Sequence, residues 1–445
     1  GLNGILADDM GLGKTIQALA ALQKAKEEHG SKPSLVIAPT SVVFNWEDEI
    51  KKFTPDLKTI NFTGPERHTK LRYFNSSDVV LTSYALIIRD IDVLKRFKFR
   101  HVILDESQKI KNHQSLTANV AKMIKTDHRL ALSGTPIENN LSELWSVFDF
   151  LMPNFLYDYD EFKSKYALPI QEHNNKDAEN KLKKQVYPFI LRRLKENVVH
   201  DLPDKLEFVQ YCDMNKEQKE LYLDTLDYTR EEIFKKIEKE GFVKNQVSIL
   251  TALLRLRQVC CHPKLLKDGK SAQIDSGKFE ELKSMIREVV EQKHRVLLFS
   301  QFVEMLDLVK SWLEIEGIKF EYLTGQTKDR KQVVDRFNKD DSIPIFLLSL
   351  KAGGTGLNLT GADYVIHYDP WWNPAVEDQA TDRAHRIGQT KKVFVYRMIT
   401  KGTVEEKIIK LQERKRNLVD SIISVDKSMS KLITYDDLKE ILSYE

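Results

Sequence analysis

The stretch GILADDMGLGKT, residues 4–15, decides how the first part of this chain folds. A short apolar run is followed by a loop containing Gly11 and Gly13, and an amphipathic helix is predicted from Lys14 onward. Glycines let a backbone wrap around phosphate groups, the Lys14 ammonium would reach the β- and γ-phosphates, and the Thr15 hydroxyl is a ligand for Mg²⁺. A glycine turn before a helix is the simpler alternative. Because strand, loop and helix follow one another in the right order, we predict a nucleotide phosphate-binding loop.

A phosphate-binding loop of this kind needs a carboxylate from another strand to position the metal ion. Residues 101–108, HVILDESQ, place Asp105 and Glu106 directly after an apolar run. Asp105 would hold Mg²⁺, and Glu106 would orient or deprotonate the attacking water. Two surface acids that cap the next helix are the alternative interpretation. One departure from the strict loop pattern is Asp8, which occupies a position where glycine is usual.

The rest of the chain shows two kinds of sequence pattern. Short apolar runs alternate with amphipathic stretches in residues 1–135 and again from residue 295, which predicts βα units and mainly parallel sheets. We expect strands at residues 3–7, 35–38, 79–82, 101–104 and 129–132, and at 296–299, 320–323, 345–348, 364–367 and 393–397. Between them lies Lys/Glu-rich helical periodicity, with a surface loop or helix at 171–184. Residues 404–423 indicate one long amphipathic helix followed by a short polar tail.

Composition excludes several classes of protein. The 445 residues carry 69 Lys and Arg against 66 Asp and Glu, a net charge of +3, so this is not a strongly basic coat or arm protein. A basic stripe in a groove remains compatible with this balance. The sequence contains no apolar run of the roughly 18 residues that span a membrane. The three cysteines, two of them adjacent, predict neither a disulfide framework nor a zinc site. We expect an intracellular protein that does not bind membranes.

Several further motifs, taken together, resemble one family. In the order of the superfamily-two helicase motifs, the chain contains DDMGLGKT (8–15), DESQ (105–108), LSGTPIENN (132–140), LLFSQF (297–302), LSLKAGGTGLNLT (348–360) and DQATDRAHRIGQ (378–389). Their variants resemble the SWI/SNF family of double-stranded-DNA translocases. Lesser hallmarks are APTSVVFNWEDE (38–49), LTSY (81–84), FILRRLK (189–195), LPDK (202–205), LRQVCCHP (256–263) and DPWWNPAVE (369–377). The resemblance covers essentially the whole chain.

The resemblance implies an α/β fold with two RecA-like P-loop lobes, mainly parallel sheets and helical insertions in both lobes. We expect the following ranges: 1–140 for lobe one, 141–200 for a helical insertion and the end of lobe one, 201–275 for a linker and helical protrusion, 276–403 for lobe two, and 404–445 for a C-terminal helical brace. The family places a glutamine-containing, adenine-reading segment before the phosphate loop. We therefore expect that segment to be missing here.

The resemblance also implies ATP and Mg²⁺ as cofactors and ATP hydrolysis as the reaction. Nucleotide contacts would come from Asp9, Gly11, Leu12, Gly13, Lys14, Thr15, Gln379, Arg383 and Arg386, with Thr15 and Asp105 holding the metal. Arg383 and Arg386 lie three apart on a predicted helix and would stabilise charge at the γ-phosphate as arginine fingers. An exposed basic pair in surface ion pairs is the alternative. Ser133 and Thr135 would sense the γ-phosphate.

Double-stranded DNA is the partner that the resemblance implies, gripped through its backbone without regard to base sequence. The matching positions are Thr40, Ser41, Thr82, Ser83, Ser300, Gln301, Lys351, Gly353 and Gly354. A DNA-bound protein, such as a nucleosome or an RNA polymerase, would be the object that is moved, and the chain itself is expected to be a monomer. For Trp371 and Trp372 we favour packing or a duplex-edge role over base stacking. Arg192 and Arg193 would brace the lobes.

Two alternatives stay open at this point. One is a strand-separating DNA or RNA helicase of the same superfamily, and the other is a nucleotide-gated DNA-binding scaffold with little turnover. A further departure concerns Ser107 and Gln108, which occupy the last two places of a motif that usually reads DEAH or DEAD. Both acids of that motif are present, so we expect activity to be retained.

Overall fold

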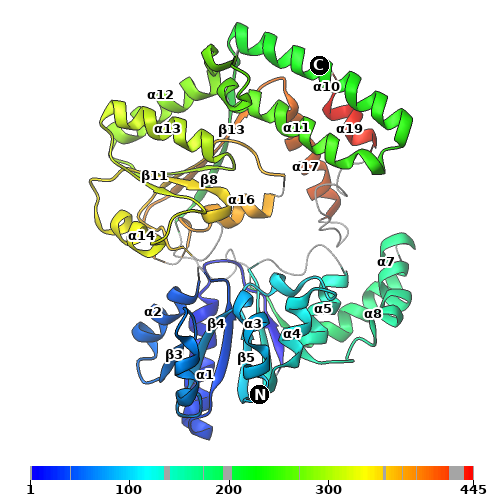
Figure 1. Ribbon diagram of the computed structural model, residues 1–445, viewed down its shortest axis with the longest axis vertical. Helices are drawn as coiled ribbons and strands as arrows, with labels where there is room; N and C mark the ends of the chain where they lie inside the picture. The colour runs from blue at the N-terminus through cyan, green and yellow to red at the C-terminus, as the bar shows by residue number, and fades with distance from the viewer. Residues whose placement is uncertain are drawn as a thin grey trace. The chain divides into compact units, whose positions relative to one another are not determined.

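The computed structural model describes residues 3–40, 42–134, 141–173, 175–193, 203–269, 271–353, 357–372, 374–386, 388–419 and 435–443. The chain divides into two units, with the boundary between residues 201 and 202 (Figure 1). Each unit is built around its own parallel sheet. The expected fold class, two α/β units with parallel sheets and helical insertions, is confirmed.

The first unit contains a seven-stranded sheet in the order β3-β4-β2-β5-β6-β1-β7, in which every pair of strands is parallel. Its strands are β1 (Gly4–Leu6), β2 (Ser34–Ala38), β3 (Thr59–Asn61), β4 (Val79–Ser83), β5 (Lys98–Leu104), β6 (Lys125–Leu132) and β7 (Ile190–Leu191). Its helices are α1 (Lys14–His29), α2 (Val43–Phe53), α3 (Tyr84–Leu94), α4 (Leu116–Met123), α5 (Leu141–Leu151), α6 (Tyr159–Phe162), α7 (Leu168–His173) and α8 (Lys176–Val186). Helices α7 and α8 occupy most of the stretch expected to be a surface loop or helix.

Parallel strands covered on both faces must be apolar on both faces, which explains why continuous apolar runs mark them in the sequence. In β2, all five residues are buried, and one hydrophobic cluster lies on each face of the sheet. Leu35 and Ile37 belong to one cluster and Val36 to the other. Since the strands share one direction, their carboxyl ends lie along a single edge of the sheet, where ligands bind in folds of this kind.

The second unit contains a six-stranded parallel sheet in the order β10-β11-β9-β12-β13-β8. Its strands are β8 (Lys205–Cys212), β9 (Val296–Ser300), β10 (Phe320–Leu323), β11 (Ile345–Ser349), β12 (Tyr364–His367) and β13 (Val393–Thr400). Its helices are α10 (Lys216–Glu240), α11 (Gln246–Cys261), α12 (Gly277–Glu291), α13 (Val303–Glu316), α14 (Arg330–Lys339), α15 (Leu350–Gly353), α16 (Pro374–Thr381), α17 (Val404–Val419) and α19 (Tyr435–Ile441).

Strand β8 differs from the sequence-based expectation, which treated residues 201–275 as linker and helical protrusion. Lys205–Cys212 instead pair with all eight residues of β13 and form an edge of the second sheet. An edge strand keeps one side in solvent, and Phe208, Val209 and Tyr211 remain 42–52% exposed. Charged and polar residues therefore interrupt the apolar run that marks central strands. The aromatic and β-branched residues Phe208 to Tyr211 were the available strand signal.

Four helices of the second unit share a hydrophobic core of their own. Helix α10 packs on α11, α11 on α17, and α17 on α19 (Figure 1). The last of these helices lies where we expected only a polar tail. Its residues Leu438 and Ile441, with Leu442 just after it, are at most 1% exposed. The helix was not predicted because it is mostly polar. These three buried apolar residues, at positions 438, 441 and 442, are enough to bury one face of so short a helix. Among the described residues, no helix is both long and apolar enough to cross a membrane.

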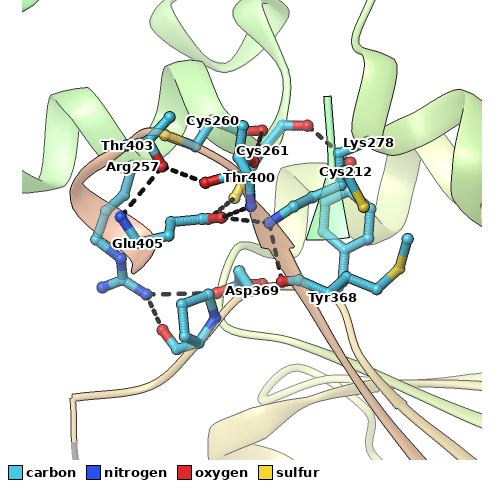
Figure 2. Close-up of polar contacts among 12 residues, drawn as sticks. Cys212, Arg257, Cys260, Cys261, Lys278, Tyr368, Asp369, Thr400, Thr403 and Glu405 are labelled. Carbon is cyan, nitrogen blue, oxygen red and sulfur yellow. Dashed lines mark hydrogen bonds and ion pairs between the residues drawn. The ribbon is translucent and has the colours of Figure 1, made fainter. Parts of the chain in front are cut away.

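A buried ion pair connects α17 and α12 to the second sheet. The ammonium of Lys278, at the start of α12, contacts the carboxylate of Glu405, on α17, at 2.5 Å, and both side chains are fully buried (Figure 2). Glu405 also accepts a hydrogen bond from the Thr400 amide at the end of β13, and Lys278 donates to the carbonyl of Met398. Although burial opposes its charge, Glu405 raises the pKa of Lys278. The pair thus joins α12, β13 and α17.

Substituting one member of this pair should be far more costly than substituting both. Lys278→Met leaves a buried, unpaired carboxylate and should lower the free energy of unfolding by about 3–5 kcal/mol. The double variant Lys278→Met/Glu405→Gln leaves no charge and keeps an acceptor for Thr400, so it should recover much of that loss. Urea denaturation of both variants tests this. A loss below about 1 kcal/mol for Lys278→Met alone would contradict the account.

Candidate functional site

The predicted phosphate-binding loop connects β1 to α1 with the backbone shape that its glycines allow. Gly11 and Gly13 have φ angles of 85° and 71°, in the left-handed region that side chains disfavour. Gly13 is the residue immediately before α1, so the free N–H groups of the first helical turn and the positive end of the helix dipole follow the loop directly. Thr15 lies in that first turn. This arrangement suits the binding of an anion.

The ammonium of Lys14 is held by the loop itself. Its Nζ donates to the carbonyl oxygens of Asp8 at 2.6 Å and Asp9 at 3.1 Å. The loop therefore folds back around its own lysine, whose charge is kept beside the place where phosphate would lie. A phosphate that binds here would compete with these two carbonyl groups for the ammonium.

Asp8, the departure from the strict loop pattern, is fully buried. Its carboxylate accepts hydrogen bonds from the backbone N–H and Nε of Arg193 and from Nε2 of Gln17, at 3.0–3.1 Å. Burial works against the charged carboxylate, yet these hydrogen bonds lower the pKa of Asp8 below its ordinary value. Arg193 was expected to brace the lobes. It binds the phosphate loop within the first unit, and nothing local in the sequence reveals this pairing across 185 positions.

The two acids Asp105 and Glu106 follow β5 in an unusual backbone conformation. Glu106 has φ 52° and ψ 57°, a left-handed conformation that is uncommon for a residue with a side chain. Its backbone N–H donates to Oδ1 of Asp105 at 2.9 Å. The Nε2 of Gln108 donates to the carboxylate of Glu106 at 2.8 Å. Strained conformations of this type gather at functional sites, and here the strained residue is the second of the two adjacent acids.

Two aromatic side chains enclose Asp105. The indole N–H of Trp46, on α2, donates to Oδ2 of Asp105 at 2.8 Å, and the Tyr84 hydroxyl donates to its backbone carbonyl at 2.8 Å. Trp46 is fully buried. Burial and the neighbouring Glu106 raise the pKa of Asp105 to about 6, while the Trp46 hydrogen bond opposes that shift. Trp46 was part of a quoted hallmark, but its partner could not be read from the sequence.

Three neighbouring strand ends bring the first-unit candidates together. Strand β6 lies between β1 and β5, so the phosphate loop, the residues after β6, and the acid pair follow one another along the edge of the sheet. Gly134, just after β6, lies against the loop, since a Cβ placed on it would come within 2.5 Å of Cγ of Met10 and 3.5 Å of Nζ of Lys14. Ser133 is buried, and its N–H donates to the carbonyl of Leu6. Thr135 lies outside the described residues.

The predicted DNA contacts of the first unit lie at the carboxyl ends of the adjacent strands β2 and β4, farther along the same edge. Thr40 is exposed. Thr82 and Ser83 are at most 1% exposed, and the Thr82 hydroxyl donates to the carbonyl of Phe62. These two buried side chains do not present a hydroxyl to solvent in this conformation. Ser41 lies outside the described residues.

In the second unit, the predicted DNA residues follow β9 and β11, which are also adjacent. The hydroxyl of Ser300 is buried and donates to Asp369, whereas Oε1 of Gln301 accepts from Nη1 of Arg257 at 3.2 Å. Arg257, on α11, thus connects the helical protrusion to this strand end. Lys351 and Gly353 lie in the backbone of α15, and Gly354 lies outside the described residues.

Arg383 and Arg386 do not lie on a helix, which corrects the sequence-based expectation. Helix α16, which carries Gln379, ends at Thr381, and the chain continues through turns in which N–H groups bond three or four residues back. Gln389 explains this course, because its buried Nε2 donates to the carbonyls of Thr360, Ala362 and Ala384. Arg383 is 5% exposed, and Nη1 of Arg386 makes a long hydrogen bond of 3.4 Å to Leu357.

Comparison with known proteins places this geometry in a family. Residues 1–265 match the SNF2-related domain, and residues 277–388 match the helicase conserved C-terminal domain. The first match alone covers more than half of the chain, so the protein belongs to the SNF2-related, helicase-like family. The resemblance inferred from its motifs is therefore confirmed.

The similar proteins include bacterial and eukaryotic members of the family. The chain is 40% identical, over its whole length, to a putative ATP-dependent helicase/translocase of Bacillus subtilis, and spans 49% of that protein. It is 36% identical over 99% of its length to the mouse SWI/SNF-related, matrix-associated, actin-dependent regulator of chromatin, subfamily A member 1, of which it spans 44%. A solved structure titled the Sulfolobus solfataricus SWI2/SNF2 ATPase core in complex with double-stranded DNA is 39% identical, with all of this chain and 93% of that chain covered and a TM-score of 0.47. The chain spans about half the length of these two curated relatives.

Removing the Trp46 donor should produce a loss of stability that depends on pH. A hydrogen bond to a charged group contributes about 1.5–3 kcal/mol, and the Trp46 bond to Asp105 is made to the ionised form. Because the folded-state pKa of Asp105 is raised to about 6, its ionisation removes stability as pH rises toward that value, and Trp46→Phe should extend this loss to higher pH. Urea denaturation at pH 5 and pH 8 should show a larger cost at pH 8.

Trp145→Phe provides the matched control for this comparison. The Trp145 indole is also buried in the first unit, but it donates to the neutral carbonyl of Tyr157 at 3.2 Å. Its substitution should cost the same at both pH values. A cost of Trp46→Phe that does not change with pH would show that the bond to the Asp105 carboxylate contributes little.

Proposed function

We propose that this chain hydrolyses ATP to ADP and phosphate and uses the cycle to move along double-stranded DNA. The observation that carries the proposal is the meeting of three strand ends, which brings the Lys14 loop, Gly134 and the Asp105–Glu106 pair to one stretch of a sheet edge. The names of its relatives, among them an ATP-dependent helicase/translocase and a regulator of chromatin, support the same activity.

Nucleotide binding is assigned to the loop between β1 and α1. The backbone N–H groups of Gly11, Leu12 and Gly13, together with Asp9, would cradle the phosphates, and Lys14 would leave the Asp8 and Asp9 carbonyls to reach the β- and γ-phosphates. The hydroxyl of Thr15 and the carboxylate of Asp105 are oxygen donors of the kind that Mg²⁺ prefers. Held by these two residues, Mg²⁺ would supply positive charge that offsets the charge of the phosphates.

Glu106 is assigned to the attacking water. Its carboxylate accepts a hydrogen bond from Gln108, whereas that of Asp105 accepts one from Trp46, so the two acids already have different partners. The Gln108 amide donates to one carboxylate oxygen of Glu106, which leaves the other available to accept a hydrogen bond from water. Gln108 would thus orient the catalytic carboxylate.

The second unit would supply positive charge to the same nucleotide. Arg386 is assigned as an arginine finger, with Arg383 and Gln379 in supporting roles. This role requires the two units to come together on one ATP, and each cycle of ATP binding and release would then change their separation. Gln389 would keep Arg386 in place, since its three hydrogen bonds fix the turn that carries the arginine.

DNA binding is assigned to the strand ends beside the nucleotide residues. Thr40, Ser41, Thr82 and Ser83 in the first unit and Ser300, Gln301, Lys351, Gly353 and Gly354 in the second are the proposed contacts. Exposed Thr40 and the main-chain N–H groups are the first of these to meet a phosphate, and the buried hydroxyls would support the backbone. Such contacts read no base sequence. A DNA-bound protein would be the object displaced by the movement.

Two substitutions should separate nucleotide binding from hydrolysis. Lys14→Ala removes the ammonium that meets phosphate in the ground state, so ATP affinity and turnover should both fall. Glu106→Gln keeps the shape and the Gln108 contact but not the base, so it should bind ATP and turn over at least about 100-fold more slowly. Measurements of ATP affinity by calorimetry and of phosphate release test both. Near-normal turnover in Glu106→Gln would overturn the role given to Glu106.

Substitution of Arg386 should abolish DNA-stimulated turnover while duplex affinity persists. An arginine finger contributes about 10³–10⁵ in kcat, and Arg386→Lys should not restore it, because an ammonium lacks the planar two-pronged guanidinium. Arg336→Lys is a matched control in the same unit, since Arg336 is half-exposed and paired with the buried carboxylate of Glu321. Loss of duplex affinity with intact turnover in Arg386→Lys would place this arginine in the DNA site.

A further inference from the structure

Arg193 contacts the phosphate-binding loop through hydrogen bonds of both its side chain and its backbone. Its guanidinium spans the two carboxylate oxygens of buried Asp8, with Nε 3.1 Å from each, and its Nη2 contacts both Asp8 and Oε1 of Gln17. Gln17 in turn donates to Asp8 and to the carbonyl of Leu12 inside the loop. The side chain of Arg193 therefore reaches the loop directly and through the first turns of α1.

The backbone of Arg193 holds the same loop. Strand β7 runs parallel to β1, and beyond their last pair the Ala7 N–H donates to the carbonyl of Leu191 at 2.7 Å. Two residues farther, the Asp9 N–H donates to the carbonyl of Arg193 at 3.0 Å, and the Arg193 N–H donates to the Asp8 carboxylate at 3.0 Å. Arg193 thus uses its N–H, its carbonyl and its side chain on two consecutive loop residues.

Those two residues are the ones that hold Lys14. The carbonyls of Asp8 and Asp9 accept the hydrogen bonds from the Lys14 ammonium. The positions of these carbonyls, and with them the resting place of the ammonium, depend on the peptide units that Arg193 fixes. Arg193 is therefore connected to Lys14 through Asp8 and Asp9, each of which contacts both residues.

Charge gives a second reason for the contact. A phosphate-binding loop receives a highly anionic ligand, and a carboxylate at position 8 would repel it if left unpaired. Arg193 neutralises that carboxylate by an ion pair in which the Asp8 side chain is fully buried and the arginine side chain is 40% exposed. The usual glycine at this position needs no such partner. Without Arg193, the unpaired carboxylate of Asp8 would oppose the binding of a phosphate.

We propose that Arg193 is a positioning residue for nucleotide binding, which fixes the Asp8–Asp9 peptide units that hold Lys14 and cancels the charge of Asp8. The inference rests on the proposed function, because it assigns the loop to ATP. It predicts an effect on nucleotide affinity that a general loss of stability does not produce.

The test is the affinity of the whole chain for a fluorescent ADP analogue with Mg²⁺, measured together with thermal unfolding. Arg193→Gln should weaken binding by about tenfold or more, in the range typical for residues that orient a ligand-binding group. Arg193→Lys should restore only part of it, since an ammonium cannot span both carboxylate oxygens and Gln17. In Asp8→Asn/Arg193→Gln no buried charge is left unpaired, so this double variant should bind more tightly than Arg193→Gln.

Arg67→Gln is the matched control. Arg67 also binds a buried carboxylate in the first unit, with Nε 2.7 Å and Nη2 3.0 Å from the oxygens of Asp90, but it has no contact with the loop among its described bonds. Its substitution should lower the unfolding temperature and leave affinity within about twofold of the unaltered chain, because the two sites are independent.

Three results would overturn the inference. They are unchanged affinity in Arg193→Gln, an equal loss of affinity in Arg67→Gln, and a double variant that binds as weakly as Arg193→Gln. Failure of the unaltered chain to bind the analogue would instead overturn the proposed function, and the inference with it. Equal, measurable binding by the unaltered chain and Arg193→Gln would overturn the inference alone.

Discussion

The common direction of the strands is the constraint on which the rest of this molecule depends. Because every described pair of strands in each sheet is parallel, all strands of a unit end on one edge, and residues far apart in the sequence meet there. In the first unit this edge carries the Lys14 loop, Gly134, the Asp105–Glu106 pair and then Thr40. The residues proposed to bind nucleotide and those proposed to bind DNA are thus neighbours by topology.

The side chain of Trp46 connects the part of this edge that is proposed to bind DNA with the part that is proposed to bind nucleotide. Trp46 lies on α2, the helix that follows the Thr40 loop, and its indole donates to Asp105 at the end of β5. A shift of α2 on DNA binding would move a donor of the carboxylate that would hold the metal. Glu106, by contrast, accepts its hydrogen bond from Gln108 in the same short segment. The hydrogen bond of Trp46 therefore offers a physical route by which DNA would stimulate hydrolysis.

Most of the fold could be predicted from the sequence, because buried parallel strands such as Ser34–Ala38 are apolar on both faces and have to appear as continuous runs. Edge strand β8 and helix α19 were not predicted. Partial exposure interrupts the apolar run of β8, and α19 is too short for its few buried apolar residues to form a recognisable pattern. In the site, Lys14 and Asp105 stand in local motifs. Arg193 and Trp46 also belong to quoted motifs, but their partners could not be read from the sequence, because these contacts span 185 and 59 positions. The segment at Arg386 was expected to be helical and is not. The hydrogen bonds of the Gln389 side chain, and not local helix propensity, determine the path of the backbone there.

Movement along an intact duplex is the central claim, and it separates a translocase from a strand-separating helicase. The most direct measurement follows a third DNA strand bound to a duplex, in the presence of ATP, beside a forked duplex under the same conditions. The account predicts that the third strand is displaced in a reaction that requires ATP hydrolysis, while the strands of the forked duplex stay paired. Separation of the forked duplex, with the third strand left in place, would contradict it.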